Sequence, residues 1–192
     1  MPRFTEAERD KIQAALLQEG ELLFSAHGLK KVTVDDLAEA ASISKGSFYA
    51  FFQNKEHLFM VINFNIQDRL LKEVKSELDE HKYMQPKELA TYILKCIFTK
   101  ATQYPILSGI DKATMLHLQR KLPPELFAAH TRDDVAMVCM LADYRIEFSR
   151  DVALVAKTLQ TLFACSNILL DDQDYDKIMS ILIGGIINLI KK

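Results

Sequence analysis

Apolar side chains recur every three or four residues along most of the chain, which is the spacing of α-helices that bury one face. The first such stretch extends from Glu6 to His27, and Gly28 follows it as a stop signal. The chain has 6 Gly and 5 Pro, too few for the turns of a many-stranded sandwich or barrel. The pattern therefore predicts an all-helical fold.

Two short helices are predicted next, at residues 34–41 and 45–52. Thr33 precedes the first of them, and two acids in its opening turn complement the positive end of the helix dipole. Ser44 is placed to cap the second. Two short helices joined by a tight turn predict a helix-turn-helix motif over about residues 33–52.

A long apolar stripe begins after Asn54, which is placed to cap a fourth helix from Lys55 to about His81. We expect this helix to link two domains. Proline residues then divide the chain into intervals that are each long enough for one or two helices. The last two predicted helices, residues 149–170 and 174–192, are strongly apolar and are interpreted as a helical hairpin.

The segment VTVDDLAEAASISKGSFYAFFQNKEHLF resembles the DNA-binding domain of the TetR family of bacterial transcriptional regulators. The resemblance covers about residues 8–70 and implies a three-helix DNA-binding domain there. It also implies that residues 71–192 form a helical domain for effector binding and dimerisation. The positions that carry the resemblance are Phe24, Gly28, Thr33, Ala38, Ala41, Ser44, Lys45, Gly46, Ser47, Tyr49, Phe52, Lys55, Glu56 and Leu58.

Seven residues of the helix-turn-helix region are candidates for DNA binding. Its second helix must fit a major groove about 12 Å wide. Gly46, which has no side chain, leaves room for close approach near the start of that helix. Lys45 and Ser47 are predicted to reach base edges, whereas the other polar groups are predicted to contact phosphates. The candidates are Thr33, Ser44, Lys45, Gly46, Ser47, Tyr49 and Lys55.

The charge distribution limits how such an interface could work. The formal net charge is −2, and residues 1–60 contain seven Lys and Arg against nine Asp and Glu, so nucleic acid is not attracted by the whole molecule. Lys30, Lys31, Lys45 and Lys55 nevertheless surround the predicted recognition helix. The alternative interpretation is a helical hairpin with ordinary solvated lysines. We expect modest affinity for non-specific DNA.

The predicted C-terminal hairpin carries more apolar surface than a small monomer buries. The resemblance implies that residues 149–170 and 174–192 pair with a second copy of the chain, and Gly184 and Gly185 would permit close approach of the helix backbones. A two-fold homodimer would read a pseudo-palindromic operator in double-stranded DNA. The alternative is a central core helix in a monomer.

An effector pocket is predicted among the central helices, where apolar bulk is combined with a few polar groups. Such a pocket would prefer a mostly apolar small molecule. Each of these residues, taken alone, is more often part of a packed core. The candidates are Phe98, Tyr104, Met115, His117, Met137, Met140, Tyr144, Phe148 and Phe163.

The remaining features predict no catalytic, metal or cofactor site. Cys96, Cys139 and Cys165 are odd in number and widely spaced, which argues against a disulfide framework or a zinc site. The aspartates at residues 172–176 lack the Gly and the closing Glu of a calcium loop. The longest nearly apolar run, residues 178–190, is too short to span a bilayer. We therefore expect a cytoplasmic protein with no cofactor and no membrane partner.

Together these features predict a homodimeric, sequence-specific DNA-binding regulator and not an enzyme. Ligand-free repression, with release from the operator by the effector, is implied by the resemblance alone. Two alternatives remain open. A helical protein-protein adaptor would show no palindromic operator and no steep loss of affinity with salt, and a small helical enzyme would turn over a compound bound in the central cavity.

Overall fold

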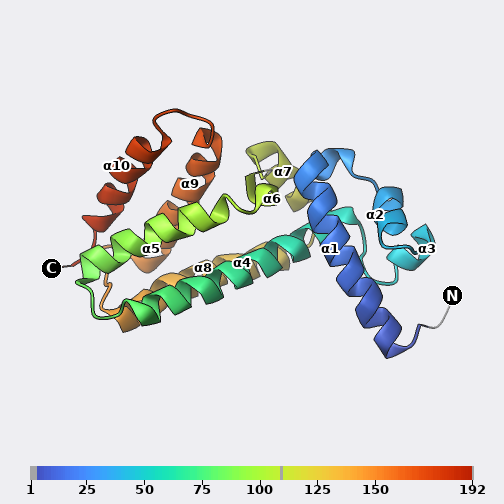
Figure 1. Cartoon of the computed structure of the whole chain (residues 1–192), viewed down its shortest axis with the longest axis horizontal. Helices are drawn as coiled ribbons and strands as arrows, with labels where there is room; N and C mark the ends of the chain where they lie inside the picture. Colours follow the sequence, from blue (N-terminus) through green and yellow to red (C-terminus); the bar gives the residue numbers. More distant parts are fainter. Residues whose placement is uncertain (1–3, 109, 192) are drawn as a thin grey trace. The chain divides into compact units, whose positions relative to one another are not determined.

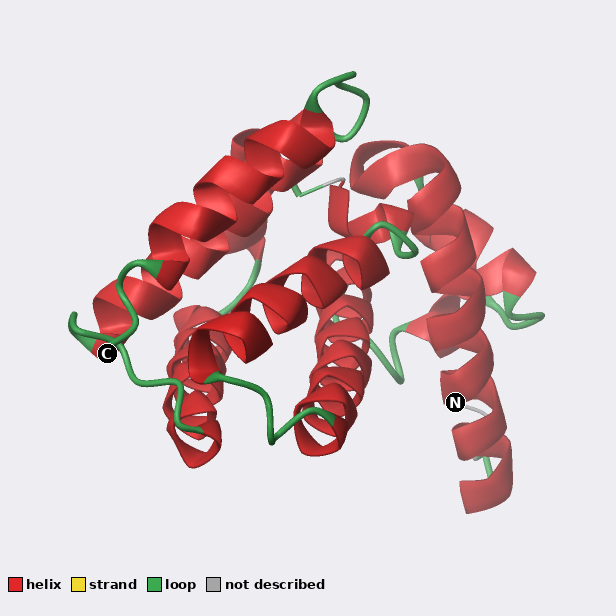
Figure 2. Ribbon diagram, turned by 60° about the vertical axis from the view of Figure 1, so that its left-hand side comes forward, coloured by secondary structure: helices red, strands yellow, loops and turns green. Residues whose placement is uncertain are grey.

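The computed structural model describes residues 4–108 and 110–191. Within these residues the regular elements are helices, and the pairing of Phe148 with Ile190 is an isolated β-bridge (Figures 1 and 2). The prediction of an all-helical fold is therefore confirmed. The elements are α1 (Glu6–Lys31), α2 (Val34–Ala40), α3 (Lys45–Phe48), α4 (Lys55–Glu80), α5 (Pro86–Ala101), α6 (Pro105–Ser108), α7 (Lys112–Lys121), α8 (Pro124–Met140), the 3-10 helix η1 (Leu141–Tyr144), α9 (Val152–Leu169) and α10 (Tyr175–Ile187).

The chain forms two compact units. The first contains Met1–Gln67 and Tyr104–Pro123, and the second contains Asp68–Gln103 and Pro124–Lys192. Helix α4 contributes residues to both units. Helices α6 and α7 belong to the first unit although they follow α5 of the second, so a division at one point of the sequence does not describe this organisation.

Helix α1 is interrupted close to its predicted end. Its first turn is held by a capping box, in which Thr5 and Glu8 exchange hydrogen bonds. Gly28 has φ 74° and ψ 161°, a backbone region that is essentially restricted to glycine, and one further helical turn leads to Lys31. The stop signal predicted at Gly28 is a break in the structure, but the chain resumes helical geometry after it.

The helix-turn-helix motif forms as the caps predict, with a shorter second helix. Thr33 and Asp36 form a capping box at the start of α2, and the Ser44 hydroxyl accepts the Ser47 amide at the start of α3. The predicted helix over residues 45–52 ends at Phe48 in the structure. Beyond it, successive amides bond three residues back and form turns, which shortens the recognition helix.

The core of the first unit joins α1, the helix-turn-helix motif and the first half of α4. Phe24 meets Phe59 edge to face, with ring centroids 5.2 Å apart, and Phe48 is fully buried. Gly20 allows α1 to approach α4 closely, because a β-carbon at that position would lie 2.9 Å from Cδ1 of Ile62. Tight packing thus fixes the angle from which α2 and α3 project.

The core of the second unit consists of three apolar clusters. One is built around Leu78 and Leu89, a second joins Phe98 to Ile183 and the third surrounds Val155. Figure 1 shows α9 and α10 side by side as a hairpin, which agrees with the predicted arrangement. The helices predicted over residues 149–170 and 174–192 are longer than the observed helices α9 and α10.

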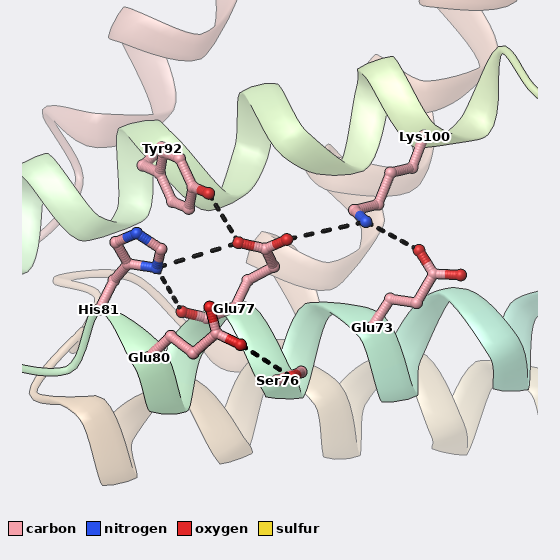
Figure 3. A network of polar contacts seen from close by, with 7 residues as sticks. All are labelled: Glu73, Ser76, Glu77, Glu80, His81, Tyr92 and Lys100. Carbon is pink, nitrogen blue, oxygen red and sulfur yellow. Dashed lines mark hydrogen bonds and ion pairs between the residues drawn. The ribbon is translucent and has the colours of Figure 1, made fainter.

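A polar network joins α4 to α5 within the second unit (Figure 3). The Tyr92 hydroxyl donates to a Glu77 carboxylate oxygen at 2.6 Å, and the Lys100 ammonium group lies 2.9 Å from Glu73. The hydrogen bond from Tyr92 lowers the pKa of Glu77, and the same bond raises the pKa of Tyr92 to about 12. The charged carboxylate and the neutral phenol are therefore the forms that the folded state favours.

The Tyr92 hydroxyl should make stability depend on pH. Because the pKa of Glu77 is lowered from 4.5, its contribution is present above that pH and is lost as pH falls through the folded-state value. We expect Tyr92→Phe to lower the free energy of unfolding at neutral pH, with a smaller difference in acid. Urea unfolding at about pH 7 and about pH 3 measures this, with Tyr83→Phe as the exposed control. A difference that is constant over this range would contradict the assignment.

Candidate nucleic-acid interface

The beginning of α3 presents an open surface. Lys45 and Gly46 are exposed, and a β-carbon at Gly46 would meet only the Ser44 hydroxyl, at an ordinary 3.8 Å. Tyr49, directly after the helix, is 51% exposed and packs its ring edge to face against buried Phe48. This geometry suits insertion of the helix into a groove, since the residues between Lys45 and Tyr49 are Gly46 and the buried Ser47 and Phe48.

Lys45 is held in place by an acid of the preceding helix. Its ammonium group lies 2.8 Å from the Asp35 carboxylate, and this contact raises the pKa of Lys45. Both side chains are more than half exposed, so the pair contributes little to stability. Its chemical effect is on orientation, because Asp35 positions the ammonium group and competes with any phosphate or base for it. Sequence reasoning missed this partner, which lies ten residues away on α2.

Ser47 is placed differently from what was predicted. The residue is 9% exposed, and its hydroxyl lies 2.8 Å from the Ser44 hydroxyl. The side chain therefore packs beneath α3 and supports the cap at its start. The contact of Ser47 with base edges stays a prediction, and in this structure its hydroxyl is engaged by the cap of α3.

The phosphate contact of Lys55 stays a prediction, and the structure shows contacts of this residue that the sequence did not predict. Its ammonium group donates to the backbone carbonyls of Leu29, Lys30 and Val32, at 2.8, 3.3 and 2.6 Å. These carbonyls belong to the last turn and cap of α1, which lack helical partners of their own. All three donor positions of the ammonium group are thus used inside the unit.

The two remaining candidate hydroxyls are exposed. The Thr33 hydroxyl donates to the Asp36 carboxylate at 2.8 Å and accepts the Asp36 amide at 3.2 Å. The hydrogen bond from the Thr33 backbone amide to that carboxylate, together with the bond from the hydroxyl, lowers the pKa of Asp36. Ser44 caps α3. Both lie at helix N-termini as predicted, and any phosphate contact at these positions has to share the hydroxyl with its cap.

Two contacts near the interface were not anticipated. The Arg9 guanidinium lies 5.2 Å from the ring centroid of Phe51, which brings a cation of α1 beside the turn that follows α3. His117 of α7 places Nε2 2.9 Å from the carboxylate of Glu56, a residue only 6% exposed in the first turn of α4. No local periodicity connects these positions, so sequence reasoning had no signal for them.

The predicted effector pocket is divided by the fold. An apolar cavity of about 20 Å³ lies in the second unit and is lined by Val74 of α4, Ile93 and Leu94 of α5 and Leu159 of α9, among others. Of the nine predicted pocket residues, Met137 and Phe148 line it. Phe98 and Phe163 stack with centroids 6.2 Å apart, and Met140 and Tyr144 pack against a neighbouring cluster. Tyr104, Met115 and His117 belong to the first unit, so they do not line this cavity.

Helices α9 and α10 carry exposed apolar side chains. Leu154, Ile168, Ile181 and Leu182 are 55, 84, 75 and 39% exposed. Apart from the adjoining backbone of α10 itself, a β-carbon placed at Gly184 or Gly185 would meet nothing within 4 Å among the residues that the structure describes, so the helix is open there. No helix in the same described part of the chain is both long enough and apolar enough to cross a membrane.

The helix-turn-helix region is similar to known proteins. Residues 16–62 match the family model described as bacterial regulatory proteins, tetR family. A probable acrEF/envCD operon repressor of Escherichia coli K12 is 37% identical over 59 residues, 31% of this chain and 27% of that protein. The HTH-type transcriptional regulator YhgD of Bacillus subtilis is 40% identical over 65 residues, 34% of this chain and 32% of that protein. The matched segment thus spans about a third or less of these relatives.

Solved structures extend the likeness of fold to almost the whole chain. A TetR-family transcriptional regulator from Pectobacterium atrosepticum has a TM-score of 0.70 at 18% identity, over 98% of this chain and 99% of that one. Reduced NemR of Escherichia coli has a TM-score of 0.69 at 16% identity, over 94% and 97%. At these identities the comparison supports the fold, and the named relatives are regulators of transcription.

Removal of the Lys55 ammonium group should destabilise the first unit. Lys55→Met leaves three carbonyl groups without their donor, which costs about 1–3 kcal/mol of the free energy of unfolding. Lys45→Met is the matched control, because its exposed ion pair contributes at most about 1 kcal/mol. Denaturant unfolding of the full chain measures both. Equal midpoints for the two variants would contradict the structural role of Lys55.

Proposed function

We propose that the chain belongs, through its N-terminal domain, to the TetR family of bacterial regulatory proteins, and that it is a repressor of transcription that binds operator DNA through α2 and α3. The observation that carries this proposal is the open face of α3, where Lys45, Gly46 and Tyr49 are exposed above a buried aromatic anchor. In this proposal Lys45 reads bases, and Tyr49 and the capped helix N-termini contact phosphates.

In this proposal the protein acts as a homodimer, and α9 and α10 form the interface between the two copies. One four-residue recognition helix reads few base pairs, so specificity requires a second copy and a pseudo-palindromic site with half-sites about 34–36 Å apart, or a multiple of that. The exposed Leu154, Ile168 and Ile181 on the hairpin, and the open backbone at Gly184, support this surface as the interface.

A mostly apolar small molecule is proposed as the effector. The cavity of the second unit is lined by α4, α5, α8, α9 and α10 and by the segment that follows η1, and α4 continues from there into the first unit. An effector that binds one arrangement of these helices better than another shifts the population of arrangements, and a change in α4 reaches the helix-turn-helix motif by covalent continuity.

The DNA-binding proposal predicts a defined operator and a defined effect of Lys45. Selection of duplexes from a random pool by the full chain, at two salt concentrations, should recover one pseudo-palindrome with lower affinity at higher salt. Lys45→Ala should weaken operator binding by about 1–3 kcal/mol and relax the base preference, and Lys72→Ala on α4 serves as the control for loss of a positive charge. Recovery of no motif would instead favour a protein-protein adaptor.

The dimer proposal predicts that a charge on the hairpin separates the subunits. Ile181→Glu places a carboxylate on a side chain that is 75% exposed in one copy. We expect its dimer dissociation constant to rise at least about tenfold, or about 1.4 kcal/mol, as measured by sedimentation. Leu22→Glu on α1, where the native side chain is 59% exposed, is the matched control. If both variants remain dimeric, the interface lies elsewhere.

A further inference from the structure

Phe148 occupies a singular place in the second unit. Its side chain packs against all three apolar clusters of that unit and also lines the cavity. Unlike most of the cavity wall, which comes from helices, Phe148 lies on the non-helical segment between η1 and α9. Phe148 is also partly exposed, whereas Ile146 on the same segment is 1% exposed.

The cavity is too small to hold an effector as it stands. Its volume is about 20 Å³, close to the space that one water molecule requires, and its lining is entirely apolar. By comparison, an engineered apolar cavity of about 150 Å³ binds benzene. An effector that enters must therefore displace a wall, and Phe148 is the wall residue with a partly open side and without a helical backbone.

The segment around Phe148 is fastened to the C-terminal end of α10. The Ser149 amide donates to the Leu189 carbonyl at 2.7 Å, and the Lys191 amide donates to the Glu147 carbonyl at 2.8 Å. The Lys191 ammonium group also lies 3.0 Å from the Glu147 carboxylate. Displacement of the Phe148 ring pulls on these bonds, because both flanking residues of Phe148 take part in them.

We propose that Phe148 is the gate of the effector site, and that the group which replaces its ring is a hydrocarbon moiety without hydrogen-bonding atoms, an alkyl chain or an unsubstituted ring. Entry of that moiety moves Phe148 outward and loosens the bonds that join residues 147–149 to residues 189–191. This inference rests on the effector site of the proposed function and adds its ligand chemistry and its moving part. A polar group in this cavity would lose its bonds to water and gain none.

The test uses the full chain with benzene and phenol as probes, without DNA. Phe148→Ala enlarges the cavity, so we expect it to bind benzene at least about tenfold more tightly than the native chain does. Phenol should bind at least about tenfold more weakly than benzene, because the described lining offers its hydroxyl no partner. Phe163→Ala is the matched control, since Phe163 stacks on Phe98 but does not line the cavity.

Hydrogen exchange provides a second measurement on the native chain. Saturation with benzene should speed exchange of the Ser149 and Lys191 amides, while amides in the middle of α5 stay unchanged. Phe148→Leu repeats the binding test if Phe148→Ala fails to fold. Equal benzene affinity for the Phe148 and Phe163 variants, equal affinity for phenol and benzene, or unchanged exchange at Ser149 would overturn the proposal. Operator selection with the ligand-free Phe148→Leu variant tests the DNA-binding proposal separately, because it needs no effector. If this variant still recovers one pseudo-palindrome, any of the outcomes above overturns the gate and leaves the DNA-binding proposal standing.

Discussion

The end of α1 leaves carbonyl groups that need hydrogen-bond donors, and the geometry of the first unit depends on how they are satisfied. Gly28 breaks the helix, and the carbonyls of Leu29, Lys30 and Val32 turn toward one ammonium group, that of Lys55. The donor stands in the first turn of α4, so a single side chain fixes the exit of α1 relative to the entry of α4. The helix-turn-helix motif is the chain between these two points.

The exposed face of α3 follows from this constraint together with the burial of aromatic side chains. Phe48 and Phe52 are anchored in the core, which leaves Lys45, Gly46 and Tyr49 on the outside. A helix of four residues has no stability of its own, so its orientation is set by its caps and anchors. The proposed recognition surface thus consists of exposed residues of α3 and its C-cap, and buried aromatic side chains hold it in place.

The second unit is under a different constraint. In the proposed function it must keep a packed core and also admit a ligand. Its cavity is small and apolar, and Phe148, one of the residues that line it, packs against all three clusters. The polar network of Glu77, Tyr92 and Lys100 joins α4 to α5 on the same unit. Packing and polar contacts therefore both restrain α4, the helix that contributes to both units.

The sequence by itself determined the helical class, the caps at Thr33, Ser44 and Asn54, and the break at Gly28, because each depends on bonds between residues at most four apart. Only the tertiary structure decided the roles of Lys55 and His117, since the partners of Lys55 lie up to 26 residues away and that of His117 lies 61 residues away. It likewise buried Ser47 and divided the predicted pocket. Local patterns specify which groups need partners, whereas long-range packing decides which partners they receive.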